Sequence, residues 1–136
     1  MVTALAHVCF TVRDLDASFD FYANKLGFTH AFDFINGQGG RHGCYLQIGG
    51  RSFIELCQGN YEEPKGGSYR HFCLEVGDIK QAGLRLAKNG YAATRKTLGA
   101  DRSWQMWTTD PSGVRIELHQ YTKASSQVTH KDCVLK

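Results

Sequence analysis

The stretch His7-Val-Cys-Phe-Thr-Val-Arg-Asp14-Leu15 occurs a second time in this chain, as His71-Phe-Cys-Leu-Glu-Val-Gly-Asp78-Ile79. Every position of the second copy lies 64 residues after its counterpart. Later in each copy, Ile54-Glu55-Leu56-Cys57-Gln58 is matched by Ile116-Glu117-Leu118-His119-Gln120 at an offset of 62. Two small deletions explain the change of offset. The chain is therefore expected to contain two copies of one unit of about sixty residues.

Each copy predicts the same order of elements: a strand, a helix and three further strands. Asp14 and Asp78 are expected to cap the helices at their N-termini, and Gly27 and Gly90 to end them. The expected core positions are Phe19, Tyr22 and Leu26 in the first helix, and Ala82 and Leu86, with Leu84 as a further candidate, in the second. The expected strands are 7–12, 29–35, 44–48 and 52–57, then 71–76, 92–96, 103–109 and 114–121.

The units are expected to form a single domain over residues 1–122, with repeat 1 at 4–60 and repeat 2 at 68–122. Tyr61 to Ser68, with Pro64 and two glycines, is the expected linker. The polar segment 123–136 has no counterpart in the first repeat. It is expected to be a mobile tail or an arm that contacts a second subunit.

Strand side chains alternate between the two faces of a sheet. In the strands of His7, Glu55, His71 and Glu117, aliphatic residues occupy one face and these four residues lie on the other. The two histidines are equivalent in the repeats, and so are the two glutamates, so a pseudo-twofold arrangement would bring them together. Two imidazoles and two carboxylates suit a borderline divalent ion. The alternative is that these four residues recur only because the unit is duplicated, and that they bind no metal.

Composition excludes several other classes of protein. The chain has 136 residues, 42% of them hydrophobic, and a net charge of +3 with scattered basic residues, which does not favour nucleic acid binding. No apolar run approaches the ~20 residues of a membrane span. The N-terminal residues predict the first strand rather than a signal peptide. Five cysteines without a C-x-x-C pair indicate free thiols in a reducing cytoplasm.

The motifs taken together resemble the vicinal oxygen chelate superfamily, which includes glyoxalase I, bleomycin-resistance proteins and extradiol dioxygenases. They extend from about Ala4 to Tyr121: His7 with Val12-x-Asp14-Leu15, Phe21-Tyr22 to Leu26-Gly27-Phe28, Ile54-Glu55-Leu56, His71 with Val76-x-Asp78, and Asp110-Pro111-x-Gly113-x-x-Ile116-Glu117. The resemblance implies an α+β fold in which two β-α-β-β-β modules form an open, cup-shaped mixed sheet with helices outside. It also implies a metal ion inside the cup and a homodimer.

The set His7, Glu55, His71 and Glu117 is similar to the ligand set of bacterial glyoxalase I. That similarity implies one divalent ion per site, Ni, Co, Zn or Mn, with Fe less favoured. It also implies a lyase or isomerase that moves a proton next to a chelated oxygen of a small substrate. Glu117 or Glu55 would be the catalytic base.

The chain differs from glutathione-using glyoxalases at positions where those enzymes contact their substrate. Thr11 stands where they have an arginine and Gly59 where they have an asparagine. The segment 101–107 supplies polar and aromatic groups instead of a basic loop. We therefore expect a hydroxylated or carboxylated small molecule, contacted by Arg102, Gln105, Trp107, Arg115 and His119. The alternative is that Trp104 and Trp107 pack in the core.

Other functions fit parts of this pattern. An Fe(II) extradiol-type dioxygenase would use His7, His71 and Glu117, although a fourth ligand at Glu55 disfavours chemistry that needs three open positions. A non-catalytic small-molecule binding or resistance protein is a further alternative, disfavoured by the intact ligand set. A fosfomycin-type transferase would normally have three ligands.

Overall fold

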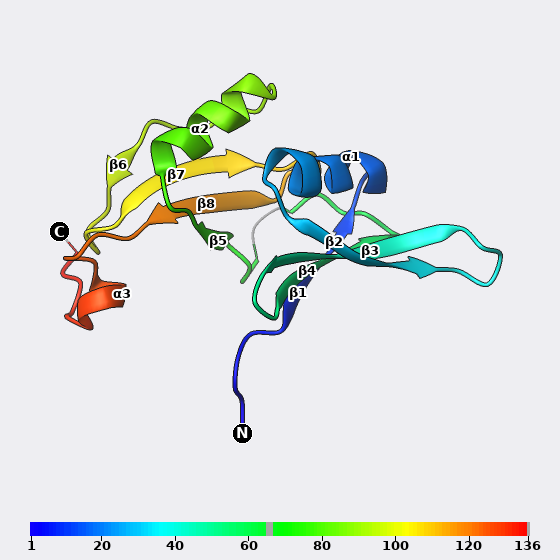
Figure 1. Cartoon of the computed structure of the whole chain (residues 1–136), viewed down its shortest axis with the longest axis horizontal. Coiled ribbons are helices and arrows are strands. Elements are labelled where there is room, and N and C mark those ends of the chain that lie inside the picture. Colours follow the sequence, from blue (N-terminus) through cyan, green and yellow to red (C-terminus); the bar gives the residue numbers. More distant parts are fainter. Residues whose placement is uncertain (65–66, 136) are drawn as a thin grey trace. The chain divides into compact units, whose positions relative to one another are not determined.

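The computed structural model describes residues 1–64 and 67–135, and the chain divides into two compact units, Met1–Pro64 and Lys65–Lys136 (Figure 1). Part of the predicted linker, residues 65 and 66, lies outside the described residues. Each unit has a four-stranded mixed sheet and helical segments, so the prediction of an α+β fold is confirmed. How the sheets join into a cup stays a prediction.

Unit 1 contains a sheet in the order β1-β4-β3-β2. Its strands are β1 (His7–Val12), β2 (Thr29–Ile35), β3 (Arg41–Gly49) and β4 (Ser52–Gln58). Only β1 and β4 run parallel; the other neighbours are antiparallel. Between β1 and β2 lie α1 (Leu15–Phe19) and the π-helix η1 (Asp20–Lys25). Asp14 caps α1 as predicted, because its carboxylate accepts a 2.9 Å hydrogen bond from the Ala17 amide.

Unit 2 repeats this topology in the order β5-β8-β7-β6, again with one parallel pair, β5 and β8. Its strands are β5 (Phe72–Glu75), β6 (Thr97–Leu98), β7 (Trp104–Thr109) and β8 (Arg115–Gln120). Helix α2 (Ile79–Lys88) follows β5, and Asp78 caps it by accepting from the amides of Lys80 and Gln81. The turn between β7 and β8 is closed by the carboxylate of Asp110, which accepts from two backbone amides.

One face of each sheet forms the core, as the alternation of side chains predicts. In unit 1, Leu46, Ile54 and Leu56 are fully buried against the helical segments, and in unit 2 Ile116 and Leu118 play the same part. Burial of such side chains stabilises each unit by roughly 1.5–3 kcal/mol per side chain. The opposite face of each sheet therefore carries the polar residues on which the functional prediction rests.

Of the three core residues predicted for the helix of unit 1, only Tyr22 is fully buried. Phe19 and Leu26 are partly exposed, and Phe21, which was not predicted, is fully buried. The π-helix is the reason: the Leu26 amide donates to the Phe21 carbonyl, five residues back, so the periodicity exceeds the 3.6 residues assumed from the sequence. In α2, Leu86 is buried as expected, but Leu84 is 63% exposed.

The predicted strand at 92–96 does not form. In its place Thr94 is attached to β7 by two bonds: its amide donates to the Trp107 carbonyl, and its hydroxyl accepts from the Trp107 amide. Because a side-chain oxygen replaces the backbone carbonyl, the regular ladder is interrupted there. Pairing with β7 is regular only at Thr97–Leu98.

The start of the polar tail packs on unit 2. Helix α3 (Ser126–Thr129) follows Ser125, which is fully buried and whose hydroxyl lies 3.0 Å from that of Ser103. Gln127 donates a 2.7 Å hydrogen bond to the Asp101 carboxylate. Buried hydroxyls thus hold residues 125–129 to their own chain, and a contact of the tail with a second subunit stays a prediction. None of the described helices is long and apolar enough to cross a membrane.

Candidate metal centre

Two of the predicted ligands, His7 and Glu55, lie close together in unit 1 on neighbouring parallel strands. His7 of β1 lies beside Phe53 of β4, so Glu55 is two residues further along the same face. The Nε2 atom of His7 is 3.4 Å from Oε2 of Glu55, and the two side chains are 40% and 19% exposed. A histidine and a carboxylate thus converge on a part of the sheet face that a small ligand can reach.

The other nitrogen of the His7 ring contacts Tyr45 of β3. Its Nδ1 atom lies 3.0 Å from the Tyr45 hydroxyl. Burial, together with the nearby Glu55 carboxylate, raises the pKa of Tyr45, so this phenol is protonated at neutral pH. A partner on Nδ1 orients the ring and leaves Nε2 directed toward Glu55, which is the arrangement that metal-binding histidines use.

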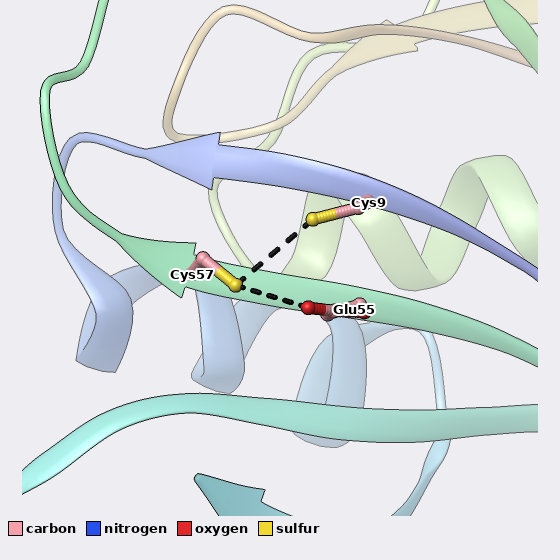
Figure 2. Close-up of side chains that lie close together, drawn as sticks. All are labelled: Cys9, Glu55 and Cys57. Carbon is pink, nitrogen blue, oxygen red and sulfur yellow. Dashed lines mark hydrogen bonds between the residues drawn. The ribbon is translucent and has the colours of Figure 1, made fainter. Parts of the chain in front are cut away.

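Two thiols lie beside Glu55 on the same face (Figure 2). Cys57 donates to Oε1 of Glu55 over 3.3 Å, and the sulfur of Cys9 is 3.9 Å from that of Cys57. Burial, reinforced by the bond to the Glu55 carboxylate, raises the pKa of Cys57 to about 12. Burial also raises the pKa of Cys9. Both groups are therefore thiols, not thiolates, at neutral pH when no cation is bound.

The other two predicted ligands, His71 and Glu117, lie close together in unit 2. His71 directly precedes β5, and its Nε2 atom is 3.1 Å from Oε2 of Glu117 on β8. On the other side of the carboxylate, Nε2 of His119 is 3.0 Å from Oε1. Glu117 and His119 are both buried, each 7% exposed. A buried carboxylate thus lies between two imidazoles, and Cys73 is close enough to Glu117 that burial and this charge raise its pKa to about 12.

The donor atoms of unit 2 fit a divalent cation. The 3.0 Å separation qualifies His119 and Glu117 as an ion pair, yet His119 Nε2 is a buried atom without a hydrogen bond of acceptable geometry. A hydrogen on Nε2 would not point at the Glu117 oxygen, although the two atoms are 3.0 Å apart. In the tautomer with its hydrogen on Nδ1, the Nε2 lone pair and the carboxylate oxygen converge as neighbouring ligands of one ion do. Cys73, Glu117 and His119 offer ligand atoms within 4.8 Å of one another.

Four of the five predicted substrate contacts lie on or beside this face of unit 2. Across the β7–β8 ladder, Gln105 is opposite His119 and Trp107 is opposite Glu117. The Arg115 guanidinium lies 4.0 Å from the centre of the Trp107 ring. Trp107 also meets the edge of the His71 ring at 4.7 Å between centroids, so it is not a core residue.

Arg102 is in a different setting. It lies in the loop before β7 with a left-handed backbone (φ 65°), and its carbonyl accepts from the Thr122 and Ser125 hydroxyls. Its side chain helps to line an open depression together with Leu98 and Val134. The structure thus gives Arg102 a place in the loop that anchors the tail, and its role as a substrate contact stays a prediction.

Sequence reasoning missed an aromatic surface in unit 1. The rings of Phe32 and Tyr45 stack at 4.6 Å with an angle of 17°, and Phe34 and Phe53 flank Tyr45. The repeat offset of 62 residues could have identified Tyr45 as the counterpart of Trp107, since both lie opposite a glutamate in the ladder. The Cys9–Cys57 pair has no such signal, because it depends on the stagger of two parallel strands.

A duplicated β-α-β-β-β unit with a His–Glu pair on each polar sheet face defines a recognisable class of protein. Residues 4–118 match the family described as the Glyoxalase/Bleomycin resistance protein/Dioxygenase superfamily. The chain belongs to this superfamily, which confirms the resemblance seen in the sequence. Members typically bind a divalent metal, and the superfamily includes many enzymes as well as non-catalytic binding proteins.

Solved structures with the same fold differ in function. TnmS3, an antibiotic binding protein from Streptomyces sp. CB03234, is 23% identical with a TM-score of 0.73, covering 89% of this chain and 98% of its own. A glyoxalase family protein from Enterococcus faecalis is 20% identical with a TM-score of 0.73, covering 85% and 96%. Lactoylglutathione lyase from Agrobacterium tumefaciens is 19% identical with a TM-score of 0.67, covering 88% and 94%. No curated protein sequence matches the chain. At these identities the likeness shows the fold alone.

Proposed function

We propose that this protein is a divalent-metal-dependent lyase or isomerase of the glyoxalase type, acting on a small oxygenated substrate. One observation carries the proposal: each unit holds a His–Glu pair with Nε2 and Oε2 close together, 3.4 Å for His7 and Glu55 and 3.1 Å for His71 and Glu117. Duplication alone explains why the residues recur, but it does not require that both pairs keep converging side chains.

These four residues are the proposed ligands of one Ni, Co, Zn or Mn ion, whether a site takes its two pairs from one chain or from two. The two carboxylates carry a charge of −2, which balances a 2+ ion. The burial of Glu117 supports this assignment, because a buried carboxylate is costly unless a positive charge or strong donors compensate it. When bound, the ion would stabilise negative charge that develops on the substrate oxygens.

The proton transfer is assigned to Glu55 or Glu117. One of these carboxylates takes a proton from the carbon next to a chelated oxygen and returns it to the neighbouring carbon, so no oxidant or reductant is consumed. Glu117 is held by His71 and His119 on its two oxygens, whereas Glu55 faces His7 on one side and the Cys57 thiol on the other.

Substrate orientation is assigned to the polar and aromatic residues beside Glu117. The exposed Arg115 guanidinium, held over Trp107, suits a carboxylate or hydroxyl group, and Gln105 is opposite His119 on the neighbouring strand. Arg102 is proposed as a further substrate contact. A homodimer and a cytoplasmic location are also proposed, the latter supported by five free cysteines.

The direct test is proton exchange. The metal-reloaded protein is incubated in deuterated water with a panel of α-hydroxy-carbonyl compounds, and deuterium uptake next to the carbonyl is followed by NMR. Exchange is expected to require added metal, to fall at least about a hundredfold in Glu55→Gln or Glu117→Gln, and to persist in the control His42→Ala, an exposed β3 residue. Metal-dependent oxygen consumption with catechols and no exchange would instead favour the Fe(II) dioxygenase that uses His7, His71 and Glu117.

A second candidate is a non-catalytic binding protein, and the aromatic surface of unit 1 favours it. Phe32 and Phe34 are 47% and 37% exposed and surround Tyr45, so a flat ring system could stack there. Tight binding of polycyclic aromatic compounds without exchange or turnover, weakened by Phe32→Ala, would support this function over the enzyme.

A further inference from the structure

Unit 1 contains a second group of metal-ligand atoms, in which two thiols that the proposed reaction does not use lie beside Glu55. Cys9 of β1 and Cys57 of β4 point toward each other and toward Glu55 from adjacent parallel strands (Figure 2). Cys9 pairs with Glu55 across the ladder, and Cys57 pairs with Thr11. This stagger places both sulfurs and one carboxylate oxygen within 4.8 Å of one another.

We propose that Cys9, Cys57 and Glu55 form a binding site for a thiophilic divalent cation, Zn²⁺ or Cd²⁺. The site lies entirely within unit 1 and does not depend on the proposed proton-transfer reaction. It uses Oε1 of Glu55, which faces Cys57, whereas Oε2 of the same carboxylate faces His7.

Two of the three distances between the ligand atoms match the edges of a tetrahedral coordination shell, and the third is within 4.8 Å. With zinc–sulfur bonds of about 2.3 Å, two thiolates on one ion are about 3.8 Å apart, and a thiolate and a carboxylate oxygen are about 3.5 Å apart. The corresponding separations here are 3.9 Å between the sulfurs and 3.3 Å from Cys57 Sγ to Glu55 Oε1. The side chains need little rearrangement to hold an ion that replaces the thiol protons.

The surroundings leave room for an ion and its remaining ligand. Cys9 is exposed and Cys57 is half-buried, so both sulfurs can be reached. Gly43 is the residue opposite Cys57 on β3, and the Phe34 ring lies over it, while the Tyr45 hydroxyl is near both thiols. Because Cys9 is exposed, a fourth coordination position can be taken by water from the solvent. Binding of one ion by two thiols releases two protons, which balances the charge of the dithiolate complex.

The two repeats differ at this point in a way that favours soft ions in unit 1. The counterpart of Cys9 is Cys73, but the counterpart of Cys57 is His119, so unit 2 has one sulfur and one imidazole around Glu117. Two thiolates select Zn²⁺ and Cd²⁺ over harder ions, whereas imidazole and carboxylate accept a wider range. The paired thiols thus distinguish the face of unit 1 chemically from the equivalent face of unit 2.

The test is a titration of the fully reduced, metal-free protein with Cd²⁺, followed by the ultraviolet sulfur-to-cadmium charge-transfer band and by proton release. The wild type is expected to develop the band up to one ion per chain and to release two protons per ion. Cys9→Ser and Cys57→Ser should each weaken binding at least about tenfold. Cys133→Ser is the matched control, because Cys133 belongs to neither cluster of ligand atoms, and it should titrate like the wild type.

Two results would overturn the proposal. One is the absence of the band in wild-type protein whose five thiols have been counted as free. The other is a band that persists in both Cys9→Ser and Cys57→Ser, which would place the cation elsewhere. The double variant His71→Ala/Glu117→Gln separates this site from the proposed active site: it should lose glyoxalase-type exchange but keep the cadmium band. Circular dichroism of every variant checks that it folds.

Discussion

The hydroxyl of Tyr45 lies 3.0 Å from Nδ1 of His7, while the opposite nitrogen of the same ring faces Glu55 at 3.4 Å. This contact between two strands orients an imidazole that would otherwise rotate on an exposed surface. Trp107 takes the equivalent place in unit 2, where it meets the His71 ring edge-on and offers no hydroxyl group. The two halves of the proposed centre are therefore supported by different interactions.

The first prediction concerns this support. Tyr45→Phe removes the hydroxyl but keeps the ring, so we expect the affinity for the divalent ion to fall about 10–100-fold with little change in folding. A competition titration against a chromogenic chelator measures the affinity. Tyr61→Phe is the control, because its hydroxyl is near Arg13 and away from the histidine. Equal affinities for Tyr45→Phe and wild type would mean that Tyr45 does not orient a ligand.

Metal binding should also stabilise the fold. A ligand that binds only the folded state at 100 times its Kd adds about 2.7 kcal/mol to the free energy of unfolding. We therefore expect the thermal midpoint to rise by several degrees when the ion is added to metal-free Cys9→Ser/Cys57→Ser protein, which lacks the thiol site. Glu117→Gln should abolish most of the rise, while Glu62→Gln, an exposed control, should not. A full rise in Glu117→Gln would remove that carboxylate from the ligand set.

Substrate binding gives a third prediction. Arg115→Met keeps an apolar side chain beside Trp107 but removes the charge. For an anionic substrate, KM should rise about tenfold or more while kcat changes less, since the loss of a charge-assisted hydrogen bond costs about 1.5–3 kcal/mol. Lys96→Met is the control, because Lys96 is held in the same way over Trp104. A fall in kcat at constant KM would instead place Arg115 in the chemical step.

The raised pKa of Cys57 predicts the pH dependence of its alkylation. An ordinary thiol with a pKa of about 8.5 is mostly thiolate above pH 9. Cys57, with a pKa of about 12, should still be reacting faster with each increase between pH 9 and 11. Glu55→Gln removes the negative charge that disfavours the thiolate, so its rate at pH 8 should be higher than in wild type. Peptide mass spectrometry after timed iodoacetamide labelling measures each rate; a plateau by pH 9 would contradict the raised pKa.

Much of this architecture could be predicted because the chain contains two copies of one unit, and each copy tests the assignments made in the other. The alternation around Ile54-Glu55-Leu56 and Ile116-Glu117-Leu118 assigns each glutamate to the face opposite the core, and the structure buries the flanking aliphatic residues as expected. The parallel pairing of the first and last strand of each unit then brings each histidine near its glutamate.

The structure differs from the prediction where the local fold depends on an interaction that leaves no periodic pattern in the sequence. The π-helix changes which residues of 20–25 face the core, and the Thr94 hydroxyl replaces a ladder bond that a strand would have made. The buried Ser125 binds the tail through hydroxyl groups, which leave no hydrophobic pattern in the sequence. The aromatic surface around Tyr45 depends on cross-strand register, which a single strand does not reveal.

The most direct test of the central claim is the metal content of purified protein, measured by plasma mass spectrometry after chelation and reloading. The account predicts near-stoichiometric Ni, Co, Zn or Mn in Cys9→Ser/Cys57→Ser protein, which lacks the thiol site. It predicts that His7→Ala, His71→Ala, Glu55→Gln and Glu117→Gln, each introduced into that background, lose most of this metal. Full metal content in all four variants, or no metal in the background protein after reloading, would contradict it.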